Sequence, residues 1–431
     1  MTSISGIFKR SHPCGGGFLL EEASGAWYND TDDKRKTNEV WCYGMYYKDK
    51  LDYQCPEKCD GHEIRAFIER NQAELLATLA ELCAIPAPSH HEEKRAEYCK
   101  NWLERNGAEG VYIDEALNVV LPLGCDGCDD ITAFAAHTDT VFPDTEPMPY
   151  EDDGRLIHCP GAADDTASVA VLLMMAKFFI QNGGKRMLFV CNSCEEGLGN
   201  LKGTRALFDM YADRIARFIS FDSNLDTVND HCVGSHRYEV TVKTRGGHSF
   251  EAFGNANAIA ELSKIVTEIY KLQIPQKEGT VTTYNVGTIS GGTSVNTIAQ
   301  SAKMLCEYRS NDKDCLAIME AEFDRIFRNA ANSEVQVIAE KVGDRPCGDI
   351  SAEKIDALKK LVVPVIENVI GKPVFLTGGS TDCNIPLSLG IPALCVGVNR
   401  HKGIHTRQEW VEKVSLVPGL EIAIRLGLAL T

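Results

Sequence analysis

The stretch RMLFVCNSCEEGLGN, residues 186–200, joins a short apolar run to two adjacent glutamates, Glu195 and Glu196. The run at 187–190 is typical of a buried β-strand, so the two glutamates stand where that strand ends. Adjacent carboxylates repel each other, and a chain that needed only solubility would scatter its acidic residues. A solvated loop is the ordinary explanation of such a pair, and the surrounding sequence decides whether it has a function instead.

Apolar strands and helical stretches alternate on both sides of this segment. The strand-like runs lie at 131–137, 186–192, 217–222, 373–377 and 392–398. The helical patterns lie at 62–85, 166–184, 203–216 and 353–371. Short continuous apolar strands that alternate with helices indicate a mostly parallel sheet covered by helices on both faces. A further helix is expected from Ser89 to about Asn106, because Ser89 and Glu92 have the S-x-x-E spacing of a capping box.

Residues 236–345 differ from this pattern. Period-two alternation marks strands at 237–246, 280–292, 302–310 and 334–342, and amphipathic helices are predicted at 255–272 and 315–331. The resulting order suits a small antiparallel sheet with two helices on one face, a ferredoxin-like α+β arrangement. We therefore predict an α/β catalytic domain formed by 61–235 and 346–431, an inserted domain at 236–345, and an irregular N-terminal extension at 1–60.

Composition excludes several classes of protein. The net charge of −17 disfavours binding to nucleic acid or to anionic membranes. The longest apolar stretch, 167–180, is interrupted by Lys177 and is too short to span a bilayer. No apolar segment of a signal peptide follows Lys9 and Arg10. We expect a cytoplasmic protein without nucleic-acid or membrane partners.

The chain has 17 cysteines, an odd number that argues against complete internal pairing. Most lie in apolar runs, as Cys83, Cys306 and Cys395 do, and behave as small buried hydrophobic residues. Two CxxC pairs and four N-terminal cysteines leave a thiol-redox or zinc-knuckle protein as an alternative. These residues are Cys125 and Cys128, Cys191 and Cys194, and Cys14, Cys42, Cys55 and Cys59.

Acidic residues and histidines follow the predicted strands one after another. Singly, each has an ordinary explanation, since an aspartate before a helix is usually a cap. Together they should meet at the carboxyl edge of the sheet, where open α/β sheets bind ligands. The candidate ligands are His137, Asp164, Glu196, Asp222 and His405. Five nitrogen and oxygen ligands without a thiolate suit two divalent metal ions, zinc first, with cobalt or manganese possible.

The motifs HTD, GAADD, EEGLG, GGHS and GIHT occur in this order between residue 61 and the end of the chain. In this ordered set the chain resembles the M20 metallopeptidase family, which includes tripeptidase T, glutamate carboxypeptidase, succinyl-diaminopimelate desuccinylase and aminoacylase. The resemblance implies that His137 and Asp222 hold one metal and that Glu196 and His405 hold the other. Asp164 would bridge the two metals, and the Asp164–Asp165 peptide bond would be cis.

The resemblance also implies catalytic roles. Asp139 would fix the ring of His137. Glu195 would take a proton from the attacking water and pass it to the leaving amine. His248, in the family's dimerisation motif, would reach an active site, usually that of the partner subunit, and stabilise the oxyanion. Substrate would be held by Asn296, Arg309 and the backbone at Gly379.

Departures from the family pattern affect the substrate. Thr166 follows the Asp-Asp pair where many relatives have Lys, and Ser380 stands where many have Gly. In the family, Asp at the position of Asp222 resembles aminopeptidases and dipeptidases. We therefore expect a homodimeric exopeptidase that acts on di- or tripeptides. The alternatives are an N-acyl-amino-acid amidohydrolase or carboxypeptidase, and a non-catalytic peptide-binding relative.

Overall fold

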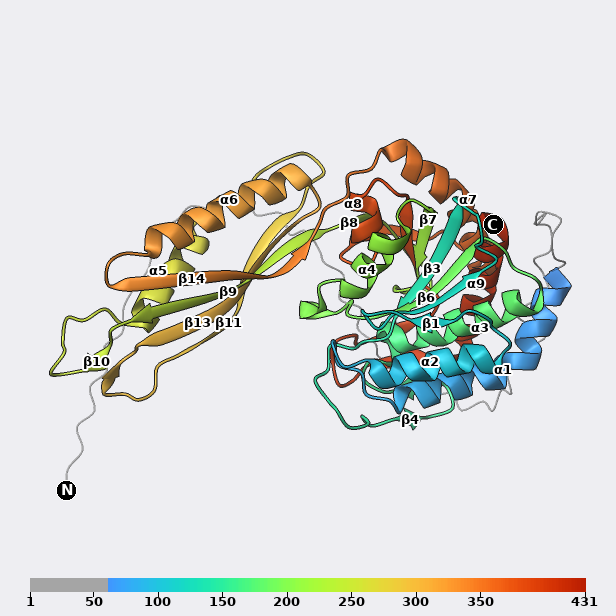
Figure 1. The fold of residues 1–431 in the computed structure, drawn as a ribbon, viewed down its shortest axis with the longest axis horizontal. Coiled ribbons are helices and arrows are strands. Elements are labelled where there is room, and N and C mark those ends of the chain that lie inside the picture. Colours follow the sequence, from blue (N-terminus) through green and yellow to red (C-terminus); the bar gives the residue numbers. More distant parts are fainter. Residues whose placement is uncertain (1–60) are drawn as a thin grey trace, which may run out of the picture. The chain divides into compact units, whose positions relative to one another are not determined.

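The computed structural model describes residues 61–431, so the predicted extension and its four cysteines lie outside the described residues (Figure 1). Its large sheet has eight strands in the order β1 (Tyr112–Ile113), β2 (Val119–Leu123), β6 (Met187–Asn192), β3 (Ile131–His137), β7 (Ile215–Ser220), β16 (Ala393–Val396), β8 (Thr227–Cys232) and β15 (Phe375–Gly379). Strand β3 pairs in parallel with β6 and β7, and the pairs β7–β16 and β8–β15 are also parallel. The predicted mostly parallel α/β sheet is confirmed.

The sheet is held by apolar strands that are buried on both faces. Every residue of β3 and β6 is buried, which explains their continuous apolar sequences. Phe134 of β3 stacks between Phe189 and Phe221, with ring centroids 5.9 and 6.2 Å away. These contacts fix β3 beside β6 and β7, so the segments that follow the three strands emerge at one edge.

Helices cover this sheet. They are α1 (Gly61–Cys83), α2 (Glu93–Arg105), α3 (Ala167–Gln181), α4 (Lys202–Tyr211), α7 (Ala352–Ile370), α8 (Asn384–Ser388) and α9 (Leu416–Leu430). Nearly all of α3 is buried, because it packs against α1, α9 and β3. The sequence patterns did not predict α9, β2 or β8, and the antiparallel pairing of β2 with β6 and of β8 with β16 was therefore unexpected.

The segment predicted to be an inserted domain folds as a second, antiparallel sheet. Its strands are ordered β11 (Thr282–Gly291), β13 (Ser301–Ser310), β9 (Gly234–Thr244) and β14 (Val335–Arg345). Helices α5 (Ala258–Ile269) and α6 (Lys313–Ala330) pack on one face of it (Figure 1). Asn257 and Asp312 cap these helices by accepting hydrogen bonds from backbone N–H groups of the first turn. The predicted α+β arrangement is confirmed.

Two small sheets and three short helical turns complete the described part of the chain. One sheet has the order β17 (His401–Lys402), β18 (Trp410–Glu412), β5 (Leu156–His158) and β4 (Glu151–Asp152), and the other pairs β10 (Gly247–His248) with β12 (Thr297–Ile298). The turns lie at Ala162–Thr166, Gly197–Gly199 and Lys413–Ser415. The first small sheet brings the loop that carries His405 close to the loop that carries Asp164.

The predicted capping box is wrong. Helix α2 begins at Glu93, and the side chain of Glu92 at its N-cap position makes no capping hydrogen bond. Ser89 donates to Asp139 instead, and Glu92 accepts from the backbone N–H of Cys194. Partners from distant parts of the chain thus replace the local hydrogen bonds that the S-x-x-E pattern suggests.

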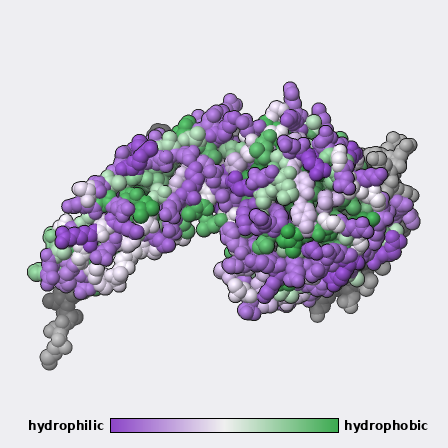
Figure 2. Space-filling model, viewed as in Figure 1, coloured by the Kyte–Doolittle hydropathy of each residue, from purple (hydrophilic) through white to green (hydrophobic). Residues whose placement is uncertain are grey.

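The molecular surface is polar. Figure 2 shows hydrophilic residues over most of the face in view, which agrees with the large negative charge of the sequence. Within residues 61–431, no helix combines the length and the apolar character needed to cross a membrane.

Candidate active site

Three groups of side chains meet at the carboxyl edge of the large sheet. In each group the potential ligand atoms lie within 4.8 Å of one another. The groups are His137 with Asp164 and Asp222, Asp164 with Glu196 and His405, and His137 with Glu195 and Glu196. All five predicted metal ligands and the predicted base are therefore brought together, from segments that span residues 137 to 405.

Asp164 lies at the centre of this cluster. Its Oδ1 is 3.0 Å from Nε2 of His137, and its Oδ2 is 3.0 Å from Nε2 of His405. The two carboxylate oxygens thus face two different histidines, as a bridging ligand requires. The Asp164–Asp165 peptide bond is cis, as the resemblance implied.

Glu409, which sequence analysis missed, holds the loop before Asp164. Its carboxylate accepts hydrogen bonds from the backbone N–H groups of Gly161, Ala163 and Asp164 at 2.9, 2.7 and 3.1 Å. Arg95 of α2 is fully buried and donates to the Thr166 hydroxyl at 3.1 Å and to the Thr138 carbonyl at 2.8 Å. Thr166, which departs from the family pattern, therefore accepts a hydrogen bond from a buried guanidinium.

The electrostatics of the cluster favour bound cations. Burial and then the Asp164 charge raise the pKa of Glu196 to about 7, and the same two causes raise the pKa of Asp222 well above its ordinary value. Hydrogen bonds to Asp164 and Glu196 raise the pKa of His405 to about 10. Four carboxylates this close repel one another, and divalent cations would relieve that repulsion. The residues present therefore fit a pair of metal ions.

Asp139 supports both the histidine and the two glutamates. Nδ1 of His137 lies 3.1 Å from the Asp139 carbonyl oxygen and 3.4 Å from its carboxylate. The carboxylate also accepts the N–H groups of Glu195 and Glu196 at 2.9 and 3.0 Å. The geometry is compatible with the predicted orientation of the His137 ring, and it adds a contact to the Glu195–Glu196 turn.

Close packing requires glycine at two positions that follow Glu196, Gly199 and Gly203. A Cβ at Gly199 would lie 2.6 Å from the Cys194 carbonyl oxygen. One at Gly203 would lie 2.4 Å from Oδ1 of Asn118 and 2.5 Å from the Ser193 carbonyl oxygen. The turn that carries Glu195 therefore folds tightly onto the chain that follows it.

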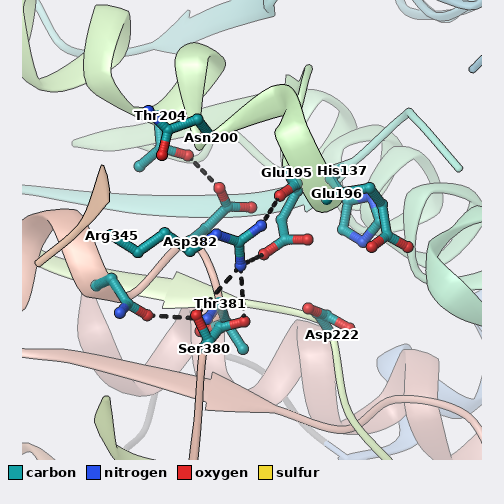
Figure 3. Close-up of polar contacts among 12 residues, drawn as sticks. His137, Glu195, Glu196, Asn200, Thr204, Asp222, Arg345, Ser380, Thr381 and Asp382 are labelled. Atoms are coloured by element: carbon teal, nitrogen blue, oxygen red, sulfur yellow. Dashed lines mark hydrogen bonds and ion pairs between the residues drawn. The ribbon is translucent and has the colours of Figure 1, made fainter. Parts of the chain in front are cut away.

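Arg345 is the second important residue that sequence analysis missed. Its Nη1 donates to Oε1 of Glu195 at 2.9 Å and to the Ser380 carbonyl at 3.1 Å, and its Nη2 donates to the Glu195 carbonyl. Figure 3 shows its guanidinium pointing at Glu195, on the side away from His137. Arg345 is the last residue of β14, and no motif in the GDRPCG sequence around it signals this contact.

A cavity of about 580 Å³ opens beside the cluster. Acidic residues and His405 line one part of it, and Arg237, Arg309 and Arg345 line another. Its other polar lining residues are Ser223, Asn224, Asn229, Ser380, Thr381 and His401. Because most of the lining residues are charged or polar, the cavity suits a small charged ligand better than a bulky apolar one.

The pairing register of the inserted sheet explains why three arginines meet. Arg309 of β13 and Arg345 of β14 both pair with Ser235, which lies on β9 between them. Two residues further along β9, Arg237 pairs with Glu307. Because residues two apart in a strand point to the same face, all these side chains share one face. Glu307 accepts from Nε of Arg309 at 2.8 Å and from Nε of Arg237 at 3.2 Å.

Three of the residues predicted to act on the substrate do not line this cavity. His248 lies in β10 and is exposed, and Asn296 lies beside it, its carbonyl accepting the N–H of Ser249 at 3.0 Å. Neither lines the cavity. Gly379 ends β15, and its carbonyl accepts the N–H of Val233 at 2.8 Å, while the next residue, Ser380, does line the cavity. Of the predicted substrate contacts, only Arg309 lies at the cavity.

The two CxxC pairs show no sign of metal binding. The candidate metal groups within residues 61–431 contain no cysteine. Cys125 donates to the Met187 carbonyl at 3.1 Å, and Cys194 donates to Glu92 at 3.2 Å. These thiols act as buried hydrogen-bond donors, so the thiol-based alternative gains no support from either pair.

Comparisons with known proteins agree with the geometry. Uncharacterized protein YqjE of Bacillus subtilis is 26% identical over 393 residues, which cover 83% of this chain and 98% of that protein. Succinyl-diaminopimelate desuccinylase of Corynebacterium glutamicum is 24% identical over 341 residues, which cover 76% of this chain and 89% of the enzyme.

A tripeptidase structure from Staphylococcus aureus matches with a TM-score of 0.67 and 22% identity, covering 83% of this chain and 99% of that chain. This likeness shows that the two share a fold. Residues 133–428 match the peptidase family M20/M25/M40. Since that match spans more than half of the chain, the protein belongs to the peptidase family M20/M25/M40 and is a metallopeptidase-type hydrolase.

Proposed function

We propose that the protein is an exopeptidase that hydrolyses the amide bond of di- or tripeptides with two bound divalent metal ions. The observation that carries this proposal is Asp164, whose two carboxylate oxygens each lie 3.0 Å from a different histidine. Glu196 and Asp222 complete the two halves of the cluster. This arrangement supports one ion held by His137, Asp164 and Asp222, and a second held by Asp164, Glu196 and His405.

Zinc is the first candidate because nitrogen and oxygen ligands of this kind suit it, and cobalt or manganese could replace it. When bound, such ions polarise a carbonyl group and lower the pKa of water. The donor set is compatible with this chemistry because its carboxylates are crowded and its histidines lie at hydrogen-bond distance from them.

Glu195 is our proposed general base. Its side chain belongs to the same group as His137 and Glu196, and it lines the cavity in which a substrate would lie. It would accept the proton of the attacking water and donate it to the leaving amine. Arg345 would hold the Glu195 carboxylate in place, because the contact at 2.9 Å is a charge-assisted hydrogen bond between buried groups.

The three arginines favour substrates with a free carboxylate close to the scissile amide. Within residues 61–431, Arg237 and Arg309 share one carboxylate, that of Glu307, so two positive charges face one negative charge and this part of the face retains positive charge. A dipeptide and an N-acyl amino acid both place a carboxylate one residue from the amide that is cleaved. An N-acyl-amino-acid amidohydrolase or carboxypeptidase is therefore the second candidate function, and the similarity to a desuccinylase supports it.

We further propose a homodimer formed through the inserted domain, in a cytoplasmic setting. Apolar side chains near His248 favour a partner, since Phe250 and Phe253 are 86% and 90% exposed. A second copy could cover them and bring its own His248 and Asn296 to this cavity. Within residues 61–431 the cysteines are free, which suits a reducing compartment.

A hydrolysis panel tests these proposals. Purified protein is incubated with dipeptides, tripeptides and N-acyl amino acids plus zinc, cobalt or manganese, and products are identified by mass spectrometry. We expect metal-dependent cleavage that a chelator abolishes. Release of the N-terminal residue from di- and tripeptides supports the exopeptidase, whereas cleavage restricted to N-acyl amino acids supports the second candidate. Full metal loading without any cleavage would contradict both and favour a peptide-binding protein.

A further inference from the structure

We propose that Ser89 and Glu92, at the start of α2, are positioning residues for the Glu195–Glu196 turn. This inference rests on the proposed function of Glu195 as the general base. Both residues come from the segment that the sequence pattern assigned to helix capping, and in the structure neither caps the helix. Their side chains point instead to the turn that follows β6.

Side chains, rather than the backbone of a helix or sheet, accept four consecutive backbone N–H groups of this turn. Ser193 donates to Asn118 at 3.1 Å, and Cys194 donates to Oε1 of Glu92 at 3.0 Å. Glu195 and Glu196 donate to the two carboxylate oxygens of Asp139. The path of the chain through Glu195 therefore depends on three side chains that come from elsewhere in the sequence.

Cys194 shows why the Glu92 contact matters. Its φ of 55° lies in the left-handed region, which residues with a Cβ rarely adopt. Glu92 accepts both the backbone N–H and, at 3.2 Å, the thiol of this residue. These two hydrogen bonds hold Cys194 in that conformation, and the conformation sets the direction in which the next residue, Glu195, leaves the turn.

Ser89 acts through Asp139. Its hydroxyl donates to Oδ2 of Asp139 at 2.6 Å, and the same oxygen accepts the N–H of Glu196. Ser89 thus fixes the carboxylate that holds the second half of the turn, while Glu92 holds the first half directly. Ser89 and Glu92 lie three residues apart, so a single short segment sets both halves.

The burial of Glu92 supports a role beyond helix capping. Its side chain is 0% exposed, and its Oε2 has no hydrogen-bond partner among residues 61–431. A carboxylate in such a place is unfavourable unless specific contacts compensate for the lost water. Serine or aspartate could cap α2 without burying a partly unpaired carboxylate. The hydrogen bonds to Cys194 therefore explain why a glutamate occupies this position.

The test compares Glu92→Ala, Glu92→Gln and Ser89→Ala with Glu93→Ala, a control at the exposed neighbouring position of α2. Each metal-loaded variant is assayed for kcat, KM, metal content and hydrogen–deuterium exchange of a peptide covering 191–200. We expect Glu92→Ala to lower kcat about 100-fold with KM and metal content unchanged, since small misplacements of a reacting group have effects of that size. Exchange within 191–200 should become faster.

The conservative variant separates positioning from a general loss of structure. Glu92→Gln keeps an acceptor oxygen for Cys194 and should retain kcat within about 5-fold of the wild type. Ser89→Ala should show a smaller loss than Glu92→Ala, and Glu93→Ala should show none.

Wild-type kcat and exchange in Glu92→Ala would overturn the inference. So would a Glu92→Gln variant as impaired as Glu92→Ala, or a loss of kcat in Glu92→Ala that follows loss of metal. If the wild type hydrolyses nothing, the proposed function fails, but the exchange measurement still decides whether Glu92 and Ser89 hold the turn.

Discussion

Two regions of opposite charge line the same cavity and are built in different ways. The acidic region lies at the edge of the parallel sheet, where Glu195 and Glu196 follow β6 and Asp222 follows β7. The basic region is one face of the antiparallel sheet, where Arg237, Arg309 and Arg345 meet across three strands. The first depends on where strands end, and the second depends on how strands are paired.

This difference decides what a single sequence reveals. A strand end is visible in the sequence because the apolar run stops there, so residues such as His137 and Asp222 can be identified directly. Pairing register is not visible in the same way, because the alignment of β9, β13 and β14 depends on contacts between distant segments. The sequence analysis therefore named each acidic side chain that lines the cavity, but of the three arginines it named only Arg309.

The largest expected effect tests the acidic region. Glu195→Gln removes the proposed base and keeps the size of the side chain, so kcat should fall by about two to four orders of magnitude. Metal content should stay at the wild-type value, because the five proposed ligands remain; it is measured by elemental analysis. Wild-type kcat in this variant would remove Glu195 as the base.

The next effect tests whether a residue outside both regions completes the site. His248 is exposed and does not line the cavity of its own chain, so we expect it to act in a partner subunit. His248→Ala should lower kcat about 100-fold, the size of effect that follows loss of an oxyanion donor. Metal content should not change.

Mixing subunits tests the same point directly. A dimer of one Glu195→Gln chain and one His248→Ala chain would contain one complete site if His248 acts across the interface. After the two impaired proteins are unfolded and refolded together, activity should then rise above that of either variant alone. Failure to recover any activity, with mixed dimers verified by mass, would contradict the exchange of His248 between subunits.

The smallest effect tests the basic region. Arg309→Met should raise KM for dipeptides about 10- to 100-fold and change kcat little, because one charge-assisted hydrogen bond to the substrate carboxylate is lost. Amides of the same peptides, which lack the carboxylate, should be unaffected. Lys303→Met is the matched control, since Lys303 is an exposed basic residue of the same strand that does not line the cavity. Equal effects on both substrates would argue against a carboxylate at Arg309.

Sequence patterns predicted much of the fold, and the exceptions have physical causes. Strands β3 and β6 were predicted because their burial on both faces leaves continuous apolar runs. Strand β8 was not predicted because its sequence, TVNDHC, is largely polar and forms no continuous apolar run. At Ser89 and Glu92 the local pattern was misleading, because tertiary hydrogen bonds to Asp139 and Cys194 replaced the capping interactions.

The position of Arg345 has a consequence for movement. It is the last residue of β14, and its guanidinium holds the side chain of Glu195. A rotation of the antiparallel sheet about this end would therefore displace the partner of the base. By thermodynamic linkage, a ligand that favours one orientation of the sheet would also favour one state of the Arg345–Glu195 pair. Substrate capture and readiness for proton transfer would then be one coupled equilibrium rather than two separate events.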